Sequence, residues 1–164
     1  MVEFREIFNM ESKETRKELV VSAIENGTVI DHIPSKSVFQ VIKQLNLHEY
    51  EDQLLVGTNL DSKKYGKKGI IKVQNRFFEQ EEINKIALVA PTASLIMIKD
   101  FKVVEKKNVS IPDHVLNIVK CANPNCITNV EDINTKFYVV DKTDLKLQCH
   151  YCEKTIVKNN IIFK

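Results

Sequence analysis

Four cysteines constrain this 164-residue chain more than any other feature, and they lie in two short pairs near its C-terminus. The first pair is Cys121 and Cys126 in "KCANPNC", and the second is Cys149 and Cys152 in "QCHYCEK". A C-x4-C and a C-x2-C pair in a short, β-rich segment favour a tetrahedral site to which each loop supplies two thiolates. We therefore expect one structural zinc ion at these four residues, with iron as the lesser chemical alternative.

Other functions for the cysteines fit less well. The N-terminal sequence lacks the apolar core and cleavage site of a signal peptide, so we expect a cytoplasmic protein, and disulfides are rare there. A redox C-x-x-C motif is normally followed by a helix, and the sequence after "CHYC" carries no helix signal. Four thiolates also close the coordination sphere, which argues against metal-catalysed hydrolysis and leaves His150 as a surface residue. The expected metal therefore has a structural role: it stabilises a segment that is too short to bury a large core.

Charge and hydropathy exclude two classes of partner. The chain has 24 Lys and Arg against 22 Asp and Glu, a formal net charge of +2. A nucleic-acid binder usually presents a strongly basic face, and a membrane-spanning helix needs about 20 consecutive apolar residues. Neither feature occurs in the sequence, so we expect no nucleic-acid partner and no membrane partner.

The order of apolar segments predicts two domains. Two apolar runs flank Asn26-Gly27, which indicates a hairpin, and the alternating and helical periods that follow complete the pattern β-α-β-β-α-β. The fold class is therefore α+β, with a ferredoxin-like split-βαβ domain followed by a small all-β zinc-binding domain. The expected domains are 1–108, with 1–18 as an N-terminal extension, and 109–164; the expected helices are 35–47 and 79–91.

Two clusters in the first domain carry functional residue types. Asp31 and His32 are adjacent, and strand alternation sends them to opposite faces unless the strand ends there. A catalytic use of this pair would need a nucleophile, and no G-x-S-x-G motif occurs. Lys68, Ile70 and Lys72 share one face of a strand, a pattern that suits a phosphate, a ribose and a base, or else a solvated edge strand protected by lysines.

Four stretches together resemble a known family: "NGTVIDHIP", "GTNLDSKKYGKKGIIKV", "CANPNCITN" and "KLQCHYCEK". In this order they resemble the regulatory chain of aspartate carbamoyltransferase, an enzyme of pyrimidine biosynthesis, over residues 20–158. The resemblance implies an allosteric domain, a zinc domain that docks on a separate catalytic chain, and no catalytic activity. It also implies a regulatory-chain homodimer within a dodecamer of six catalytic and six regulatory chains.

The resemblance further implies a nucleotide site at which CTP, with UTP, inhibits and ATP activates. The matching positions are Val21, Ala23, Ile24, Val29, Asp31, His32, Lys68, Ile70, Lys72, Ile98, Phe101, Val103 and Lys106. Among these, Lys68, Lys72 and Lys106 match phosphate-binding or ribose-binding positions. The positions that match the catalytic-chain interface are Asn123, Asn125, Glu153 and Lys154.

The chain departs from the family at three positions. Ile96 stands where better-known members have asparagine, Phe101 where they have tyrosine, and Glu18 where they have a basic residue. These changes concern base discrimination rather than the zinc ligands. The expected mechanism is linkage, in which each nucleotide favours a different geometry of the domain pair and thereby changes the distant active sites.

Two alternatives compete with this interpretation. A zinc-ribbon protein that binds nucleic acid would carry stacking aromatic residues on its central strands, and "GIIKV" has none. A free-standing enzyme built on Asp31 and His32 would need a nucleophile or an open metal site.

Overall fold

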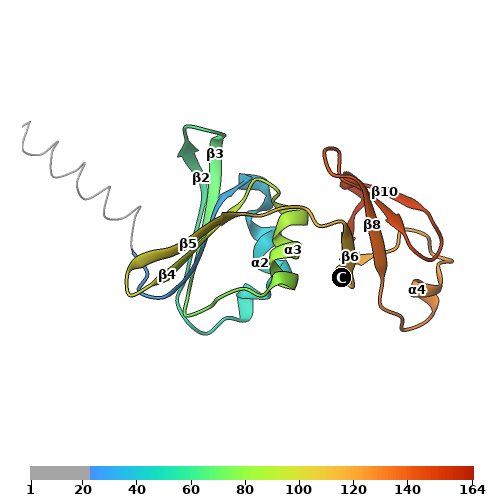
Figure 1. The fold of residues 1–164 in the computed structure, drawn as a ribbon, viewed down its shortest axis with the longest axis horizontal. Coiled ribbons are helices and arrows are strands. Elements are labelled where there is room, and N and C mark those ends of the chain that lie inside the picture. The colour runs from blue at the N-terminus through green and yellow to red at the C-terminus, as the bar shows by residue number, and fades with distance from the viewer. Residues whose placement is uncertain (1–22) are drawn as a thin grey trace, which may run out of the picture.

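A computed structural model describes residues 23–164 as two lobes, drawn in Figure 1. The first lobe consists of β1 (Gly27–Ile33), α2 (Val38–Gln44), β2 (Leu54–Ser62), β3 (Gly66–Gln74), α3 (Gln80–Val89), β4 (Ser94–Lys99) and β5 (Lys102–Asn108). Short 3-10 turns cover Ser35–Ser37 and Leu47–Glu49. Residues 23–26 are not a strand, so this part of the predicted first hairpin arm is wrong, and the rest lies outside the described residues.

The first lobe is a five-stranded antiparallel sheet with strand order β2-β3-β1-β4-β5. Removing the edge strand β5 leaves the ferredoxin-like order, which confirms the predicted split-βαβ fold. Ile30 pairs with Ile71 and with Leu95 across the three central strands, and all three side chains are buried under α2 and α3. The helices therefore cover one face of the sheet, and within residues 23–164 no helix covers the other face, which we call the open face.

Helix α3 shows how local sequence sets an element boundary. The side chain of Glu79 accepts from the backbone of Glu82, and the Glu82 side chain accepts from the backbone N–H of Glu79, so the two form a reciprocal capping box. Ile83 and Ile86 lie on the buried side, and the helix ends just before Pro91. The helix thus starts and stops where the sequence predicts, to within one or two residues.

The second lobe is all-β apart from one turn of helix. Its strands are β6 (His114–Leu116), β7 (Val119–Lys120), β8 (Lys136–Asp141), β9 (Lys146–Cys149), β10 (Thr155–Val157) and β11 (Ile162–Phe163), with α4 at Ile127–Val130 and a 3-10 turn at Lys158–Asn160. The larger sheet has the order β10-β9-β8-β6, and β11 pairs with β7. The α+β class with a small second all-β domain is therefore confirmed.

The two lobes share apolar contacts. Leu88 belongs to α3 but packs within the core of the second lobe, around Phe137 and Leu147. Phe163, near the C-terminus, packs against the cores of both lobes. None of the helices in the described part of the chain has the length and apolar character that crossing a bilayer requires.

Candidate functional site

The open face of the first sheet gathers most of the residues that the resemblance assigns to nucleotide binding. Val29 pairs with Lys72 on β3 and with Ile96 on β4, and Ile96 pairs in turn with Lys106 on β5. Directly paired residues of antiparallel strands point to the same face. Alternation adds Asp31, Ile70, Lys68 and Ile98 to this face.

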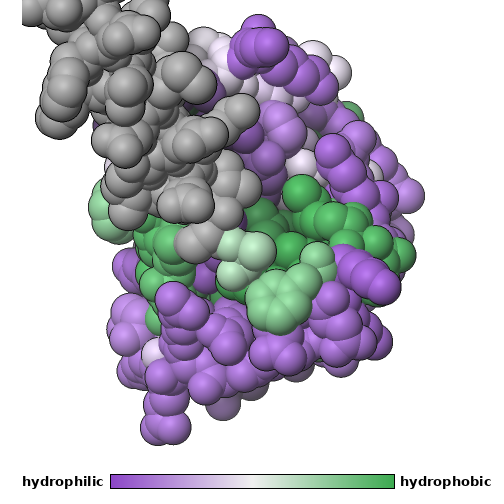
Figure 2. All heavy atoms as spheres, turned by 90° about the vertical axis from the view of Figure 1, so that its left-hand side faces the viewer, coloured by the Kyte–Doolittle hydropathy of each residue, from purple (hydrophilic) through white to green (hydrophobic). Residues whose placement is uncertain are grey.

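The open face has an apolar centre. Figure 2 views the molecule from this side and shows a hydrophobic band with hydrophilic side chains above and below it. Phe101 and Val103, at the β4–β5 hairpin, are exposed. An apolar band between charged side chains suits a ligand that is flat and apolar at one end and charged at the other.

Two irregularities in the sheet bring together side chains that regular strand alternation would place apart. Between Ile30 and Ile33 the register of β1 shifts, and His32 adopts a left-handed backbone with φ 57°. As a result its Nδ1 lies 3.6 Å from the Asp31 carboxylate and 3.1 Å from the hydroxyl of Ser94. Regular alternation would send Asp31 and His32 to opposite faces unless the strand ended there; β1 continues to Ile33, and it is a bulge that brings the two side chains together.

A second bulge lies in β5. Met97 pairs with Glu105, but the next residue, Ile98, pairs with Val103. The residue skipped by the pairing allows Val103 and Lys106, three positions apart, to share the open face. The bulge thus brings both predicted residues to the same site.

Asp31 is held as a carboxylate by its neighbours. The Lys68 Nζ lies 2.7 and 3.0 Å from its two oxygens, and the backbone N–H of His32 donates to Oδ1 at 2.6 Å. Burial acts to raise the pKa of Asp31, but the hydrogen bonds from Lys68 and His32 outweigh it and the pKa lies below its usual value. Lys68 and Asp31 therefore form a fixed, charged corner of the face.

Lys72 lies deeper, in the middle of the sheet. Its side chain is buried, with 7% of the residue exposed. Burial lowers the pKa of Lys72, and the charge of Asp31 opposes this shift only in part. A partly desolvated ammonium group gains more from an arriving anion than a solvated one does.

Three further positions of the predicted nucleotide site, Val21, Ala23 and Ile24, precede β1 in the sequence. Ile24 is buried and Ala23 is exposed, and both precede β1, while Val21 lies outside the described residues. Phe101 has φ 60° and its N–H donates to the carbonyl of Glu25 at 2.9 Å. The β4–β5 hairpin is thereby tied to the segment that enters β1.

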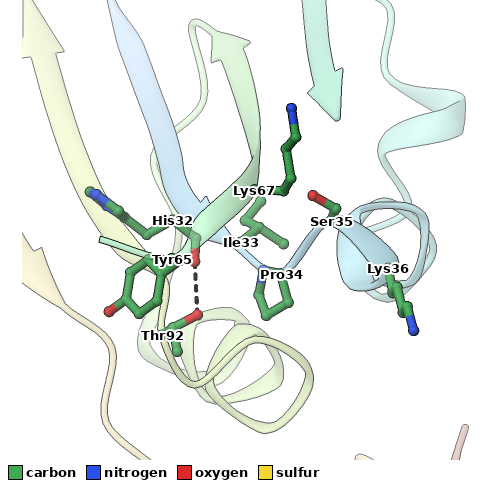
Figure 3. Close-up of a pocket in the computed structure, with 8 residues that line it drawn as sticks. All are labelled: His32, Ile33, Pro34, Ser35, Lys36, Tyr65, Lys67 and Thr92. Carbon is green, nitrogen blue, oxygen red and sulfur yellow. Dashed lines mark hydrogen bonds between the residues drawn. The ribbon is translucent and has the colours of Figure 1, made fainter. Parts of the chain in front are cut away.

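A hollow of about 370 Å³ lies beside the bulge. Figure 3 shows that the imidazole of His32 points away from Pro34 and Ser35, while its carbonyl accepts a hydrogen bond from Thr92 at 2.8 Å. Tyr65, from the β2–β3 hairpin, contacts the His32 ring edge-on at 5.7 Å between centroids. These contacts fix the bulge from both sides.

The second lobe brings the four cysteines together. Their sulfur atoms all lie within 4.8 Å of one another, with Cys121 to Cys152 at 3.6 Å and Cys126 to Cys149 at 3.8 Å. A tetrahedral zinc site with Zn–S bonds of about 2.3 Å requires sulfur separations of about 3.8 Å. The distances match a four-thiolate metal site, and none of these cysteines forms a disulfide.

The thiol groups need a cation to be charged together. Burial raises the pKa of Cys121 to about 12 and also raises that of Cys149. For Cys152, burial is outweighed by hydrogen bonds from the backbone of Lys154 and the side chain of Asn123, which lower its pKa to about 7. A bound metal ion would supply the charge that stabilises the other thiolates.

Two residues that support this site were not identified from the sequence. The hydroxyl of Thr128 lies 3.3 Å from the sulfur of Cys126. The side-chain amide of Asn129 donates to the carbonyls of Cys121 and Asn123, at 2.9 and 2.7 Å, and so closes the first cysteine loop. Only their position just after a ligand would have indicated such a supporting role.

The predicted interface residues lie within the first cysteine loop or directly after the second. The carbonyl of Asn123 accepts from the N–H of Cys126, and its side chain accepts from the N–H of Asn125. Glu153 has φ 60° and its N–H donates to the carbonyl of Cys149, while the carbonyl of Lys154 accepts from the N–H of Cys149. The same backbone that positions the sulfurs therefore positions these four residues.

Comparison with known proteins decides the family. Residues 19–110 match the aspartate carbamoyltransferase regulatory chain, allosteric domain, and residues 113–162 match the metal binding domain of the same chain. The chain belongs to the aspartate carbamoyltransferase regulatory chain family. This membership confirms the resemblance seen in the sequence and identifies the four-cysteine lobe as the metal-binding domain of that family.

Individual relatives match over nearly their whole length. The regulatory chain of Thermococcus sibiricus is 53% identical over 89% of this chain and 97% of its own length. Those of Bacteroides fragilis and Parabacteroides distasonis are 52% and 48% identical, over 90% and 93% of this chain and 97% and 99% of their own lengths. Both lobes are therefore part of the similarity.

Proposed function

We propose that the chain is the non-catalytic regulatory subunit of aspartate carbamoyltransferase and binds nucleoside triphosphates on the open face of its first sheet. CTP and UTP inhibit from this site and ATP activates. The main support for this proposal is that apolar residues of β1, β4 and β5 share this face with Lys68, Lys72 and Lys106. Family membership supplies the regulatory role.

The residues divide by chemistry along this face. Lysine ammonium groups pair with phosphate oxygens, and an apolar strand surface accepts the flat side of a base. Asp31 accepts hydrogen bonds from ribose hydroxyls while Lys68 holds it in place. Ile96, in the middle of the band, presents no polar group, so the base is held there by its shape and by backbone groups rather than by a side chain.

Replacing Lys106 by alanine tests the site. Lys106 pairs with Ile96 on the open face, whereas its neighbour Lys107 pairs with Leu95 and belongs to the opposite side of β5. We expect Lys106→Ala to weaken ATP and CTP binding about tenfold, from the loss of one charge-assisted phosphate contact, and Lys107→Ala to leave it nearly unchanged. Titration calorimetry on the full chain measures both, and equal affinities in the two variants would contradict the assignment.

We further propose that one zinc ion per chain occupies the four cysteines and shapes the surface that docks on the catalytic chain. Zinc fits because it prefers four tetrahedral thiolates and performs no redox chemistry. Asn123, Asn125, Glu153 and Lys154 form the docking surface, since the loops that hold the sulfurs also hold these residues. The complex acts in pyrimidine biosynthesis in the cytoplasm.

A homodimer of regulatory chains forms through β2 in this proposal. Strand β2 is an edge of the sheet, and Val56 on β2 and Phe39 on α2 are exposed apolar side chains on the helix side of the sheet. Pairing two β2 strands satisfies the unpaired backbone groups and covers these side chains. Three such dimers with six catalytic chains complete a dodecamer.

A further inference from the structure

A chain of four aromatic rings crosses the outer face of the second lobe. His114 contacts Tyr138 edge-on at 5.2 Å between centroids, Tyr138 contacts His150 at 5.6 Å, and His150 contacts Tyr151 at 5.0 Å. The hydroxyl of Tyr138 also lies 2.8 Å from Nδ1 of His150, at hydrogen-bonding distance. These rings come from β6, from β8 and from the turn after β9, so the contacts connect three separate segments.

These rings are not needed to fill the core. Phe137, the neighbour of Tyr138 on β8, is fully buried with Val115 and Leu147, whereas Tyr138 points to the other face. His114, His150 and Tyr151 are exposed. Because the core is complete without them, the contacts among the rings serve the surface of the lobe rather than its interior.

Two rings of this chain, those of His114 and His150, lie in different parts of the lobe. His114 lines a cavity of about 470 Å³ at the boundary between the lobes, together with Glu81 and Asn84 of α3. His150 lies between Cys149 and Cys152, in the turn that leads directly to Glu153. The backbone N–H of His150 also donates to the carbonyl of Lys136 on β8 at 2.9 Å, so β8 holds this turn by its backbone as well as by Tyr138.

We propose that Tyr138 is a positioning residue for docking of the catalytic chain, because it fixes the Cys149–Cys152 turn in the conformation that presents Glu153. This inference rests on the proposed function, in which the metal loops form the docking surface. A loop that is already ordered before binding loses less conformational entropy on docking. Tyr138 supplies this order from outside the metal coordination, through the imidazole of His150.

Removing one hydroxyl group tests the proposal. Tyr138→Phe keeps the ring contacts but loses the hydrogen bond to His150, and we expect it to weaken binding of the full, zinc-loaded chain to the catalytic chain about three- to tenfold. Zinc content, measured on the same preparations, stays at one ion per chain. Tyr65→Phe makes the same chemical change in the other lobe and leaves docking unchanged.

Variants of His150 separate positioning from a general structural role. Asparagine places a polar atom near the position of Nδ1, whereas glutamine places it near Nε2, so His150→Asn retains most of the docking affinity and His150→Gln loses it. Combining Tyr138→Phe with His150→Gln weakens docking no more than the worse single change, because both remove the same contact.

The outcomes distinguish this inference from the proposed function. If the unaltered chain binds the catalytic chain and Tyr138→Phe binds with the same affinity, the role of Tyr138 is overturned while the regulatory function stands. Additive losses in the double variant overturn it as well. If the unaltered, zinc-loaded chain fails to bind the catalytic chain, the docking function and the inference both fall.

Discussion

Asp31 and Lys68 show how a single ion pair serves both the fold and the site. Their side chains are 15% and 21% exposed, and Lys68 holds the carboxylate next to His32 at the end of β1. A pair this well enclosed is less screened by water than a surface pair. The corner of the open face therefore depends on the charge of Asp31.

Replacing Asp31 by asparagine tests this dependence. We expect Asp31→Asn to lower the free energy of unfolding at pH 7 by about 1–2 kcal/mol, because a hydrogen-bonded charge is lost and Lys68 is left partly buried. Asp61→Asn is the matched control: Asp61 pairs with Lys67 on the same hairpin, but its side chain is 95% exposed, so its loss costs almost nothing. Thermal unfolding followed by circular dichroism measures both variants.

The pH dependence of the same variant has a fixed sign. The folded pKa of Asp31 lies below its ordinary value of 3.8, so its contribution is fully present above pH 3.8 and is lost as the pH falls through the folded pKa. The difference between the unaltered chain and Asp31→Asn should therefore shrink in acid. A difference that stays constant below this range would show that the charge of Asp31 is not its source.

At the scale of elements, the C-terminal strand β11 joins the two lobes. Phe163 pairs with Val119 of β7 and packs against both cores, and Leu88 reaches from α3 into the second core. The backbone N–H of Lys164 donates to the carbonyl of Ile118 at 3.0 Å. We therefore expect a change in the position of α3 to reach the second lobe through these packed side chains.

Replacing Phe163 by alanine tests this connection. Phe163 is only half-buried, so we expect a loss of about 2 kcal/mol in the stability of the second lobe, less than for a fully buried phenylalanine. We also expect a weaker effect of ATP and CTP on the activity of the assembled enzyme, with nucleotide affinity nearly unchanged. Ile162→Ala on the same strand, whose side chain is exposed, serves as the control. An undiminished nucleotide effect would exclude this route of coupling.

Elements were predictable where a local signal determines them. The cysteine spacing predicted the metal site. Acidic residues in the first turn predicted where α3 begins, and Pro91 predicted where it ends. Strand alternation placed Lys68, Ile70 and Lys72 on one face. The bulges at His32 and in β5 were not predictable, because a bulge depends on which residues the partner strand offers. The contacts of Thr128, Asn129 and Phe163 were not predictable either, because they form only when a loop closes or when segments distant in the sequence come together.

At the scale of the whole molecule, the two lobes differ in what holds them together. The first lobe has a core built from two helices and a five-stranded sheet, with Ile30, Val41, Ile71 and Ile86 almost fully buried. The second lobe has short strands, and its cysteines are part of its core. Its stability therefore includes the free energy of metal binding.

Metal removal should separate these two contributions. We expect a strong chelator to unfold residues 114–163 and release the catalytic chain, while the sheet of the first lobe persists because its core contains no metal ligand. Two-dimensional NMR of the labelled chain measures the folding of each lobe, since the amide signals of the two lobes can be followed separately. Loss of dispersion throughout the chain would contradict independent stability of the first lobe, and no change at all would contradict a structural metal.

If this chain makes a catalytic chain sensitive to nucleotides, the effect will appear in the reaction rate of the assembled complex. Purified catalytic chain is assayed for carbamoyl transfer to aspartate with and without the zinc-loaded chain, at a subsaturating aspartate concentration, as ATP or CTP is added. We predict that nucleotides change the rate only in the assembled complex and that Lys106→Ala shifts this change to about tenfold higher nucleotide concentration. A complex that forms but gives the same rate with and without either nucleotide would contradict the proposed regulatory role of this chain.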